Sequence, residues 1–261
     1  MRRPSLVLLT ALALAACGST PDTPPQAGPP PDGAATVSGA VTVFAAASLT
    51  ETFTALGEEF EAANPGTTVT FNFAGSSALA QQITQGAPVD VFAAASPATM
   101  QVATDAGSIT AAPTVFVRNK LQIAVPTGNP AGITGLADFA DDAKAIALCA
   151  EQVPCGAAAT KAFDAAGVTP KPDTLEQDVK AALTKVRLGE VDAALVYETD
   201  VKAAGADVEG IAFPEAEQAI NDYPIAALAD APNPAGADAF IAYVLSEKGR
   251  AALTDAGFTA P

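Results

Sequence analysis

The chain has 261 residues, of which 49% are hydrophobic, enough apolar material for at least one large folded domain. It carries 13 Lys+Arg against 29 Asp+Glu and contains no His, so its formal net charge is −16. This acidic balance excludes nucleic acid and acidic membrane surfaces as binding partners. The lack of His also removes the commonest general base and metal ligand of proteins.

The first residues have the order of a secretory signal. Arg2 and Arg3 precede an apolar run over residues 6–16, which is too short to span a bilayer and ends in Leu-Ala-Ala directly before Cys17. This order predicts a signal peptide at residues 1–16 that ends in a lipoprotein cleavage box. Acylated Cys17 would anchor the protein to the outer face of the cell membrane. An ordinary signal peptide that ends near a cysteine by chance is the alternative.

The next segment is predicted to be a tether. Residues 17–40 are rich in Pro, Gly, Ser and Thr and include three consecutive prolines at 29–31. Such a composition buries too little apolar surface to form a core, so we expect a disordered, semi-stiff linker. The folded region is predicted to start at Val41.

From Val41 onward, segments typical of buried strands alternate with helical segments. The strand-like segments are residues 41–45, 68–73, 89–93, 121–125, 145–148, 193–196 and 223–228. Helical spacing is clearest in two sets of apolar residues, Leu49, Phe53, Leu56 and Phe60, and Val179, Leu183 and Val186. The alternation predicts an α/β fold with parallel sheets covered by helices on both faces. Ligands are then expected at the carboxyl ends of the strands.

Two of the predicted strands run into a serine that opens a helix. Ser48 follows the sequence Phe-Ala-Ala-Ala, and Ser76 follows Phe-Ala-Gly. Backbone N–H groups at a helix start lack intrahelical acceptors and point outward, so two such corners that face each other would hold an anion. Taken singly, each serine is better explained as a helix cap.

Three more corners follow in the second half of the chain. Pro154, directly before Cys155, suits a helix entry. Asp178 can cap the helix that starts at Val179, which leaves the Val179 N–H free and should turn the carboxylate away from an anion. Tyr197 ends a strand, where its phenol can donate one hydrogen bond into a cleft. Singly, Tyr197 and the Val179 side chain are better explained as core residues.

Together, these segments resemble the periplasmic molybdate-binding proteins of ABC importers. The matching motifs are Val-Phe-Ala-Ala-Ala-Ser-Leu-Thr at residues 43–50, Phe-Ala-Gly-Ser-Ser-Ala-Leu-Ala at 73–80, Gly-Ala-Pro-Val-Asp-Val-Phe at 86–92, Val-Pro-Cys-Gly at 153–156, Glu-Gln-Asp-Val at 176–179 and Val-Tyr at 196–197. They occur in the family's order from Val41 almost to the C-terminus. The resemblance therefore covers essentially the whole folded region.

The resemblance implies an α/β, two-lobed periplasmic-binding-protein fold that is type II-like, in which each lobe is a mostly parallel sheet flanked by helices and an oxyanion lies between the lobes. Lobe 1 would comprise residues 41–120 and 225–261, and lobe 2 residues 121–224. The chain would cross between them near residues 118–124 and 211–224.

The resemblance also implies the ligand and its contacts. Carried over residue by residue, the oxyanion-binding residues are Ser48, Ser76, Cys155, Val179 and Tyr197. The serines and the tyrosine would supply hydroxyl groups, and all but the tyrosine would supply backbone N–H groups. The ligand would be molybdate or tungstate, with no cofactor and no metal other than molybdenum in its oxyanion. The partner would be an ABC permease, and the protein a monomer that meets the membrane only through its lipid.

Cys155 departs from the family pattern, which has a small residue after the proline. Because the expected contact uses the backbone, the change need not disturb binding. Cys149 and Cys155 are the thiols that remain besides Cys17, and they bracket the loop before this corner. Outside the reducing cytosol we expect them to form a disulfide, with free buried thiols as the alternative.

A site made only of donors suits a tetrahedral dianion that is fully deprotonated near neutral pH, such as molybdate, tungstate or sulfate. Phosphate retains a proton and needs an acceptor. A receptor for another tetrahedral oxyanion, such as sulfate, is therefore the nearest alternative. An enzyme that used either serine as a nucleophile would lack a histidine base, so no catalytic residue is predicted. A non-transport envelope lipoprotein would explain the N-terminal segment but not the five corners.

Overall fold

The computed structural model describes residues 37–261, which belong to one compact unit. The predicted signal peptide, Cys17 and most of the predicted tether lie outside the described residues. Among the helices of residues 37–261, none is long and apolar enough to cross a membrane.

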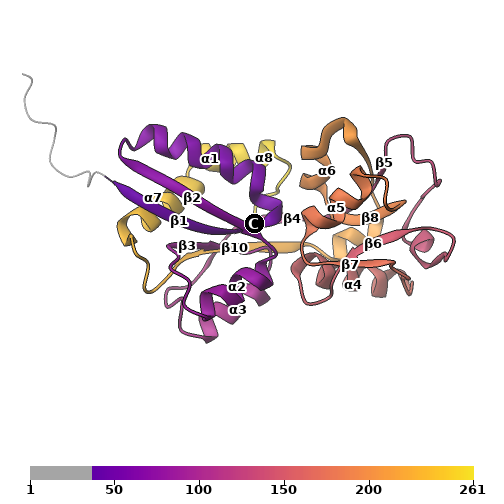
Figure 1. Cartoon of the computed structure of the whole chain (residues 1–261), viewed down its shortest axis with the longest axis horizontal. Coiled ribbons are helices and arrows are strands. Elements are labelled where there is room, and N and C mark those ends of the chain that lie inside the picture. The colour runs from indigo at the N-terminus through magenta and orange to yellow at the C-terminus, as the bar shows by residue number, and fades with distance from the viewer. Residues whose placement is uncertain (1–36) are drawn as a thin grey trace, which may run out of the picture. The chain divides into compact units, whose positions relative to one another are not determined.

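The strands form two five-stranded sheets, each of which is the centre of one lobe (Figure 1). The sheet of lobe 1 has the order β2-β1-β3-β10-β4, and that of lobe 2 has the order β7-β6-β8-β5-β9. The lobe 1 strands are β1 (Gly39–Ala46), β2 (Thr67–Ala74), β3 (Val91–Ala93), β4 (Thr114–Asn119) and β10 (Asn221–Ala227). The lobe 2 strands are β5 (Leu121–Pro126), β6 (Ile146–Cys149), β7 (Thr174–Glu176), β8 (Ala193–Tyr197) and β9 (Val208–Ile211).

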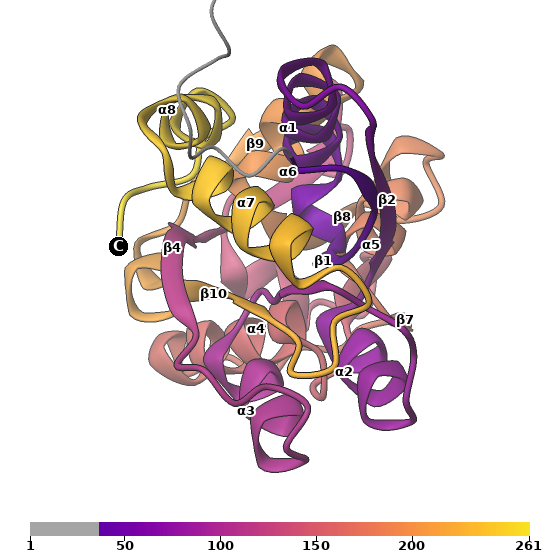
Figure 2. The ribbon, with the colours of Figure 1, turned by 90° about the vertical axis from the view of Figure 1, so that its left-hand side faces the viewer.

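Helices cover both faces of the sheets. On the lobe 1 sheet, one face carries α1 (Thr50–Ala63), α7 (Pro234–Leu245) and α8 (Glu247–Asp255), and the other carries α2 (Ser76–Thr84) and α3 (Pro97–Asp105), as Figures 1 and 2 show. On the lobe 2 sheet, α5 (Val179–Arg187) and α6 (Glu198–Ala204) lie opposite α4 (Pro154–Ala166). Short 3-10 helices are η1 (Ala47–Leu49), η2 (Leu136–Ala140), η3 (Gly205–Asp207) and η4 (Pro214–Gln218).

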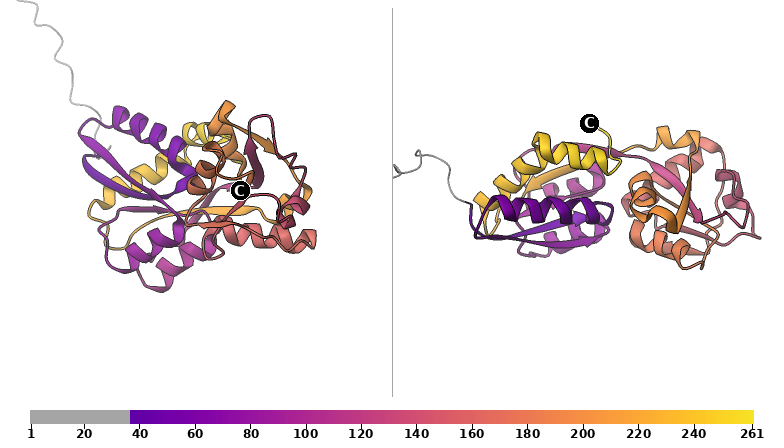
Figure 3. Two further views of the ribbon diagram at one scale, coloured as in Figure 1. Left: turned by 45° about the vertical axis from the view of Figure 1, so that its right-hand side comes forward. Right: turned by 90° about the horizontal axis from the view of Figure 1, so that it is seen from above.

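Both sheets are mostly parallel, as predicted. In lobe 1, β10 is antiparallel to β3 and β4, and the remaining strands share one direction. In lobe 2, β5 is the antiparallel strand between β8 and β9. Each antiparallel strand is the one that the chain enters directly after crossing from the other lobe. The crossings join β4 to β5 and β9 to β10 (Figure 3).

Two predicted boundaries differ from the strand pairing. Strand β1 begins at Gly39, which pairs with Thr67, so the last two residues of the predicted tether are part of the sheet. Strand β10 pairs with β4 from Asn221 onward, where Asn221 lies opposite Asn119. Residues 221–224, assigned to lobe 2 from the resemblance, therefore belong to the lobe 1 sheet, because their backbone already pairs with β4.

Apolar side chains bury each sheet as the helical spacing indicated. In lobe 1, Phe53 and Phe60 of α1 pack against Phe240 of α7, with ring centroids 6.0 and 5.5 Å from that ring. A second cluster on the other face includes Leu79 and Phe92. Lobe 2 has one cluster that includes both Val179 and Tyr197. These cores hold the strand ends, and with them the corners, in fixed positions.

Candidate functional site

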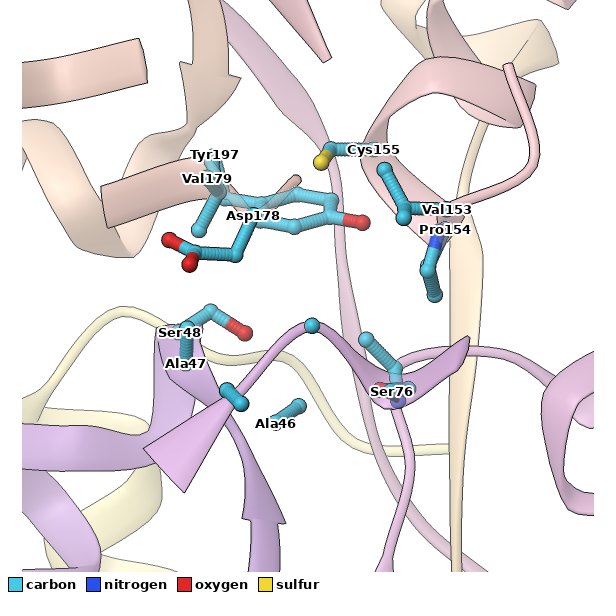
Figure 4. A pocket seen from close by; sticks show the side chains of 13 residues that line it. Ala46, Ala47, Ser48, Ser76, Val153, Pro154, Cys155, Asp178, Val179 and Tyr197 are labelled. Atoms are coloured by element: carbon cyan, nitrogen blue, oxygen red, sulfur yellow. Dashed lines mark hydrogen bonds between the residues drawn. The ribbon is translucent and has the colours of Figure 1, made fainter. Parts of the chain in front are cut away.

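A pocket lies between the two lobes at the strand-to-helix corners (Figure 4). Its lining from lobe 1 is Ala46, Ala47, Ser48, Ala74, Gly75, Ser76 and Ala95, and from lobe 2 it is Val153, Pro154, Cys155, Asp178, Val179 and Tyr197. Its volume, measured as the space open to the centre of a water-sized sphere, is about 20 Å³. All five residues predicted to bind the ligand line this one pocket, which has room for a small ion and not for an organic solute.

The lobe 1 corners present buried hydroxyl groups. Strand β1 ends at Ala46, and the turn of η1 places Ser48 with 4% of its surface exposed. Strand β2 ends at Ala74, and Ser76 is the first residue of α2, with 1% exposed. Each backbone N–H is in the first turn of a helix, where no intrahelical carbonyl can accept it. Small residues before each serine keep the strand ends open to a ligand.

The lobe 2 corners present backbone groups instead. Cys155 is the second residue of α4 after Pro154, and Val179 is the first residue of α5. Their side chains belong to the hydrophobic core, so their N–H groups are what they can offer to the pocket. The Asp178 carboxylate accepts the Ala181 N–H at 2.9 Å and points away from the middle of the pocket (Figure 4).

A disulfide joins Cys149 to Cys155, with a Cα–Cα distance of 5.7 Å. It links the end of β6 to the first turn of α4. At Gly156, the next residue, a Cβ atom would overlap the Ala150 carbonyl of the same loop. The loop therefore approaches the helix start closely, which fixes the direction of the Cys155 N–H.

Each of the hydroxyl groups at the pocket has a polar partner behind it. The Ser76 Oγ accepts the Ala95 N–H at 2.9 Å. The Tyr197 hydroxyl accepts from Asn221 Nδ2 at 2.7 Å, and the Ser48 Oγ lies 2.8 Å from the Tyr223 hydroxyl. The hydroxyls of Ser48 and Tyr197 point into the space between the lobes (Figure 4).

Both tyrosines hold their protons firmly. Burial raises the pKa of Tyr197 well above its ordinary value, and neighbouring Tyr223 and Asp200 raise it further. Burial also raises the pKa of Tyr223, although a hydrogen bond with Ser48 opposes the shift. The phenols therefore remain hydrogen-bond donors at neutral pH.

Neither Lys nor Arg is among the pocket-lining residues. The cation next in sequence to the site is Lys180, whose Nζ lies 3.0 Å from Asp200 Oδ1 and 2.9 Å from both carboxylate oxygens of Glu51. Burial by itself lowers the pKa of Lys180, but the two carboxylates outweigh it and leave that pKa raised. The positive charge is thus compensated, and the pocket offers neutral dipoles. Within residues 37–261 there is no cluster of His, Cys, Asp and Glu able to hold a metal ion.

The lobes touch each other around the pocket. Glu51 belongs to α1 of lobe 1, so its ion pair with Lys180 of α5 spans the lobes. Ser77 Oγ donates to the Gln152 carbonyl at 2.6 Å. A Cβ atom on Gly75 would overlap the Gln177 carbonyl oxygen and lie 3.5 Å from Asp178 Cβ. The pocket is therefore enclosed by contacts that require both lobes.

Comparison with known proteins identifies the family. Residues 41–259 match the family model described as bacterial extracellular solute-binding protein. The chain belongs to this family. This solute-binding protein is 42% identical over 248 residues to "Molybdate-binding protein ModA" of Mycobacterium tuberculosis H37Rv, a match that covers 95% of the chain and 93% of that relative. The resemblance inferred from the motifs is confirmed. That relative is named for binding molybdate, and the family is described as binding solutes outside the cell.

Solved structures confirm the two-lobed fold of this solute-binding protein. The periplasmic molybdate-binding protein of Azotobacter vinelandii has a TM-score of 0.72 at 20% identity and covers 85% of this chain and 99% of its own. The sulfate-binding protein SubI of M. tuberculosis has a TM-score of 0.73 at 16% identity and covers 85% and 86%. At these identities the two likenesses show the fold alone.

Sequence reasoning missed several residues that shape the pocket of this solute-binding protein. Gly75 contributes through its small size and Ala95 through its backbone N–H, and neither property is indicated by a pattern of side chains. Asn119, Asn221 and Tyr223 lie behind the pocket, outside its lining. A usable signal was the position of both asparagines within the predicted crossings.

Proposed function

We propose that this protein captures molybdate or tungstate outside the cytoplasm and delivers it to the permease of an ABC importer. Membership in the solute-binding family supports a receptor role. The 42% identity to a relative named as molybdate-binding supports the choice of anion, since it extends over 95% of the chain.

The observation that carries the proposal is the donor-only chemistry of the pocket. Hydroxyls of Ser48, Ser76 and Tyr197 and first-turn N–H groups from both lobes surround a space for one small ion. Tetrahedral oxyanions without a proton offer acceptors in every direction and match this arrangement. Neutral donors bind such an anion by short charge-assisted hydrogen bonds, without a cation that would attract other anions.

The proposal assigns five residues to the anion, Ser48, Ser76, Cys155, Val179 and Tyr197. We further propose that the protein is a monomer and that acylated Cys17 holds it at the outer face of the cell membrane. Palmitate labelling of cells that express the wild type and Cys17→Ala tests the anchor. Labelled wild type and unlabelled variant are expected, and labelling of both or of neither contradicts it.

Isothermal titration of the Thr36–Pro261 fragment tests the ligand. Molybdate, tungstate, sulfate and phosphate are titrated at one ionic strength. Tight binding of molybdate and tungstate with little sulfate heat is expected. Sulfate binding without molybdate binding would make the protein a receptor for the smaller anion, and failure of all four anions to bind would refute the proposed function.

The double variant Ser48→Ala with Ser76→Ala tests the site. Each hydrogen bond to a charged group contributes about 1.5–3 kcal/mol, so we expect molybdate affinity to fall roughly 10²- to 10⁴-fold. The matched control is Thr54→Ala with Thr84→Ala, which removes exposed hydroxyls from α1, the helix that follows Ser48, and from α2, the helix that contains Ser76. An unchanged affinity in the serine variant would refute the site assignment.

A further inference from the structure

The proton direction of the pocket hydroxyls is set by groups behind them. A hydroxyl has one proton to donate and two lone pairs that accept. At Ser76, the backbone N–H of Ala95 occupies a lone pair at 2.9 Å. The Ser76 proton is therefore free to point to the pocket. In general, a hydroxyl that accepts a hydrogen bond on its side away from the pocket can donate its own proton on the side that faces the pocket.

Asn221 acts in this way on Tyr197. Its Nδ2 lies 2.7 Å from the Tyr197 hydroxyl and 3.3 Å from the Pro154 carbonyl oxygen. A carbonyl can only accept, so the amide must turn its NH₂ group toward Pro154, which fixes the amide orientation. Asn221 consequently donates to the Tyr197 oxygen, so the phenol proton faces away from Asn221, toward the pocket and the neighbouring Tyr223 hydroxyl.

Asn119 acts on Ser48 through Tyr223. The Asn119 Oδ1 accepts the Lys120 N–H at 3.0 Å, so its NH₂ group is fixed on the opposite side. That group donates to Thr199 Oγ1 at 2.8 Å and lies 3.5 Å from the Tyr223 hydroxyl. Facing an amide donor, Tyr223 directs its proton to Ser48 Oγ at 2.8 Å, which leaves the Ser48 proton for the pocket.

The two asparagines occupy matching places. Asn119 is the last residue of β4 and Asn221 the first of β10, and they lie opposite each other where the chain passes between the lobes. Their exposed fractions are 3% and 6%. Both belong to the lobe 1 sheet, yet each donates to a hydroxyl of lobe 2, Thr199 or Tyr197.

We propose that Asn221 and Asn119 are positioning residues that fix the Tyr197 and Ser48 hydroxyls as donors and so restrict the ligand to oxyanions without a proton. This inference rests on the proposed function of the pocket as an oxyanion site. A hydrogen phosphate ion would turn its own O–H toward a group that already points a proton at it, and that O–H would stay unpaired in a buried site. The asparagines thereby determine specificity without touching the ligand.

The variant Asn221→Asp reverses the polarity at Tyr197. Next to the Pro154 carbonyl, an aspartic acid places its own O–H on that carbonyl or ionises, and in both cases its other oxygen accepts from Tyr197. The phenol then presents a lone pair to the pocket. Sulfate and hydrogen phosphate are both dianions of similar size above the second pKa of phosphate. An added charge or a change of pocket size therefore alters both dissociation constants by a similar factor and leaves their ratio unchanged.

Competition titrations of the Thr36–Pro261 fragment give the expected result. In Asn221→Asp the preference for sulfate over hydrogen phosphate should fall at least tenfold relative to the wild type, and molybdate should bind more weakly. In the Tyr197→Phe background the same substitution should leave the ratio unchanged, because the hydroxyl through which it acts is missing. Equal weakening of all anions, or an equal change of ratio in both backgrounds, would overturn the inference.

The outcomes separate this inference from the proposed function. A wild type that binds sulfate but not molybdate refutes the molybdate proposal alone. A wild type that prefers hydrogen phosphate to sulfate overturns the inference alone. Neutron diffraction from deuterium-exchanged crystals needs no ligand. A Tyr197 deuteron directed at the pocket supports the inference even if no anion binds, and one directed at Asn221 or at Tyr223 overturns it.

Discussion

The two lobes share one plan but use different chemistry at their corners. Strands β1, β2 and β3 hold the same places in the lobe 1 sheet as β6, β7 and β8 in the lobe 2 sheet. The corners after β1 and β2 carry the hydroxyls of Ser48 and Ser76. The equivalent corners after β6 and β7 carry Cys155 and Val179, whose side chains are in the core.

The difference shows that an anion corner can be built in two ways. In lobe 1 the side chain and the backbone both face the pocket, so the residue type matters. At the lobe 2 corners after β6 and β7 the backbone alone faces it, and the surrounding structure must hold that backbone in place. The disulfide at Cys155 and the Asp178 cap at the start of α5 supply this support.

The largest effect expected of a single substitution comes from Gly75→Ala, which tests whether the lobes must meet at this residue. Gly75 has φ −58° and ψ 129°, which alanine adopts without strain, so its Cβ would be a problem only where the Gln177 carbonyl of lobe 2 approaches. We expect molybdate affinity to fall roughly 100-fold, while thermal stability without ligand is unchanged or slightly raised. Titration and thermal melts measure the two quantities.

Two other glycines are controls for Gly75→Ala. Gly135 has extended backbone and no atom within 4 Å of a Cβ position, so Gly135→Ala should change neither affinity nor stability. At Gly156 the overlap is with Ala150 of the same lobe, so Gly156→Ala should lower stability with and without ligand. If Gly75→Ala destabilised the ligand-free protein as Gly156→Ala does, the contact would not be specific to lobe closure.

A second pair of variants compares a side-chain corner with a backbone corner. Ser76→Ala removes a hydroxyl and should weaken molybdate binding roughly 10- to 100-fold with little change in stability. Val179→Ala keeps the N–H and should leave affinity within about threefold, while loss of core packing lowers the free energy of unfolding by about 1–3 kcal/mol. A loss of affinity in Val179→Ala as large as that in Ser76→Ala would show that lobe 2 also uses its side chain.

The disulfide variant Cys149→Ser with Cys155→Ser tests the support of a lobe 2 corner. The closed loop is short, with a sequence separation of 6, so the chain-entropy model gives a loss of about 2 kcal/mol in the free energy of unfolding. Affinity should fall only a few-fold, because helix α4 still orients the Cys155 N–H. Urea denaturation and titration measure both, and complete loss of binding would make the disulfide a requirement for the site.

The smallest expected effect is the response of binding to alkaline pH. Burial raises the pKa of Tyr197 in lobe 2 and of Tyr223 in lobe 1, whereas the unfolded chain ionises tyrosine near its ordinary value of about 10. The folded protein therefore binds more protons above that pH, and the free energy of unfolding should fall as pH rises past 10. Molybdate affinity should stay flat from pH 7 to that point. A decline in molybdate affinity with an apparent pKa well below 10 would contradict the conclusion that burial keeps both phenols protonated.

The sequence predicted all the interior strands and one edge strand, β2, but it missed the other three edge strands. β4, β7 and β9 are edge strands and were not predicted, since each is partly exposed and lacks a continuous apolar run. Interior strands such as β1, β3 and β8 are buried and are visible as apolar segments. A local sequence pattern indicates which residues are buried, and the three missed strands are too exposed to produce such a pattern.

The sequence by itself determined which residues could supply donors, because strand, turn and helix-start chemistry is local and leaves a pattern at Ser48, Ser76 and Val179. The tertiary structure alone decided which way the hydroxyl protons point and why Gly75 has no side chain. Those properties depend on Asn221, Tyr223 and Gln177, which the chain brings to the site from distant positions. Contacts between such distant residues leave no periodic pattern in the sequence, so they are seen only in the folded structure.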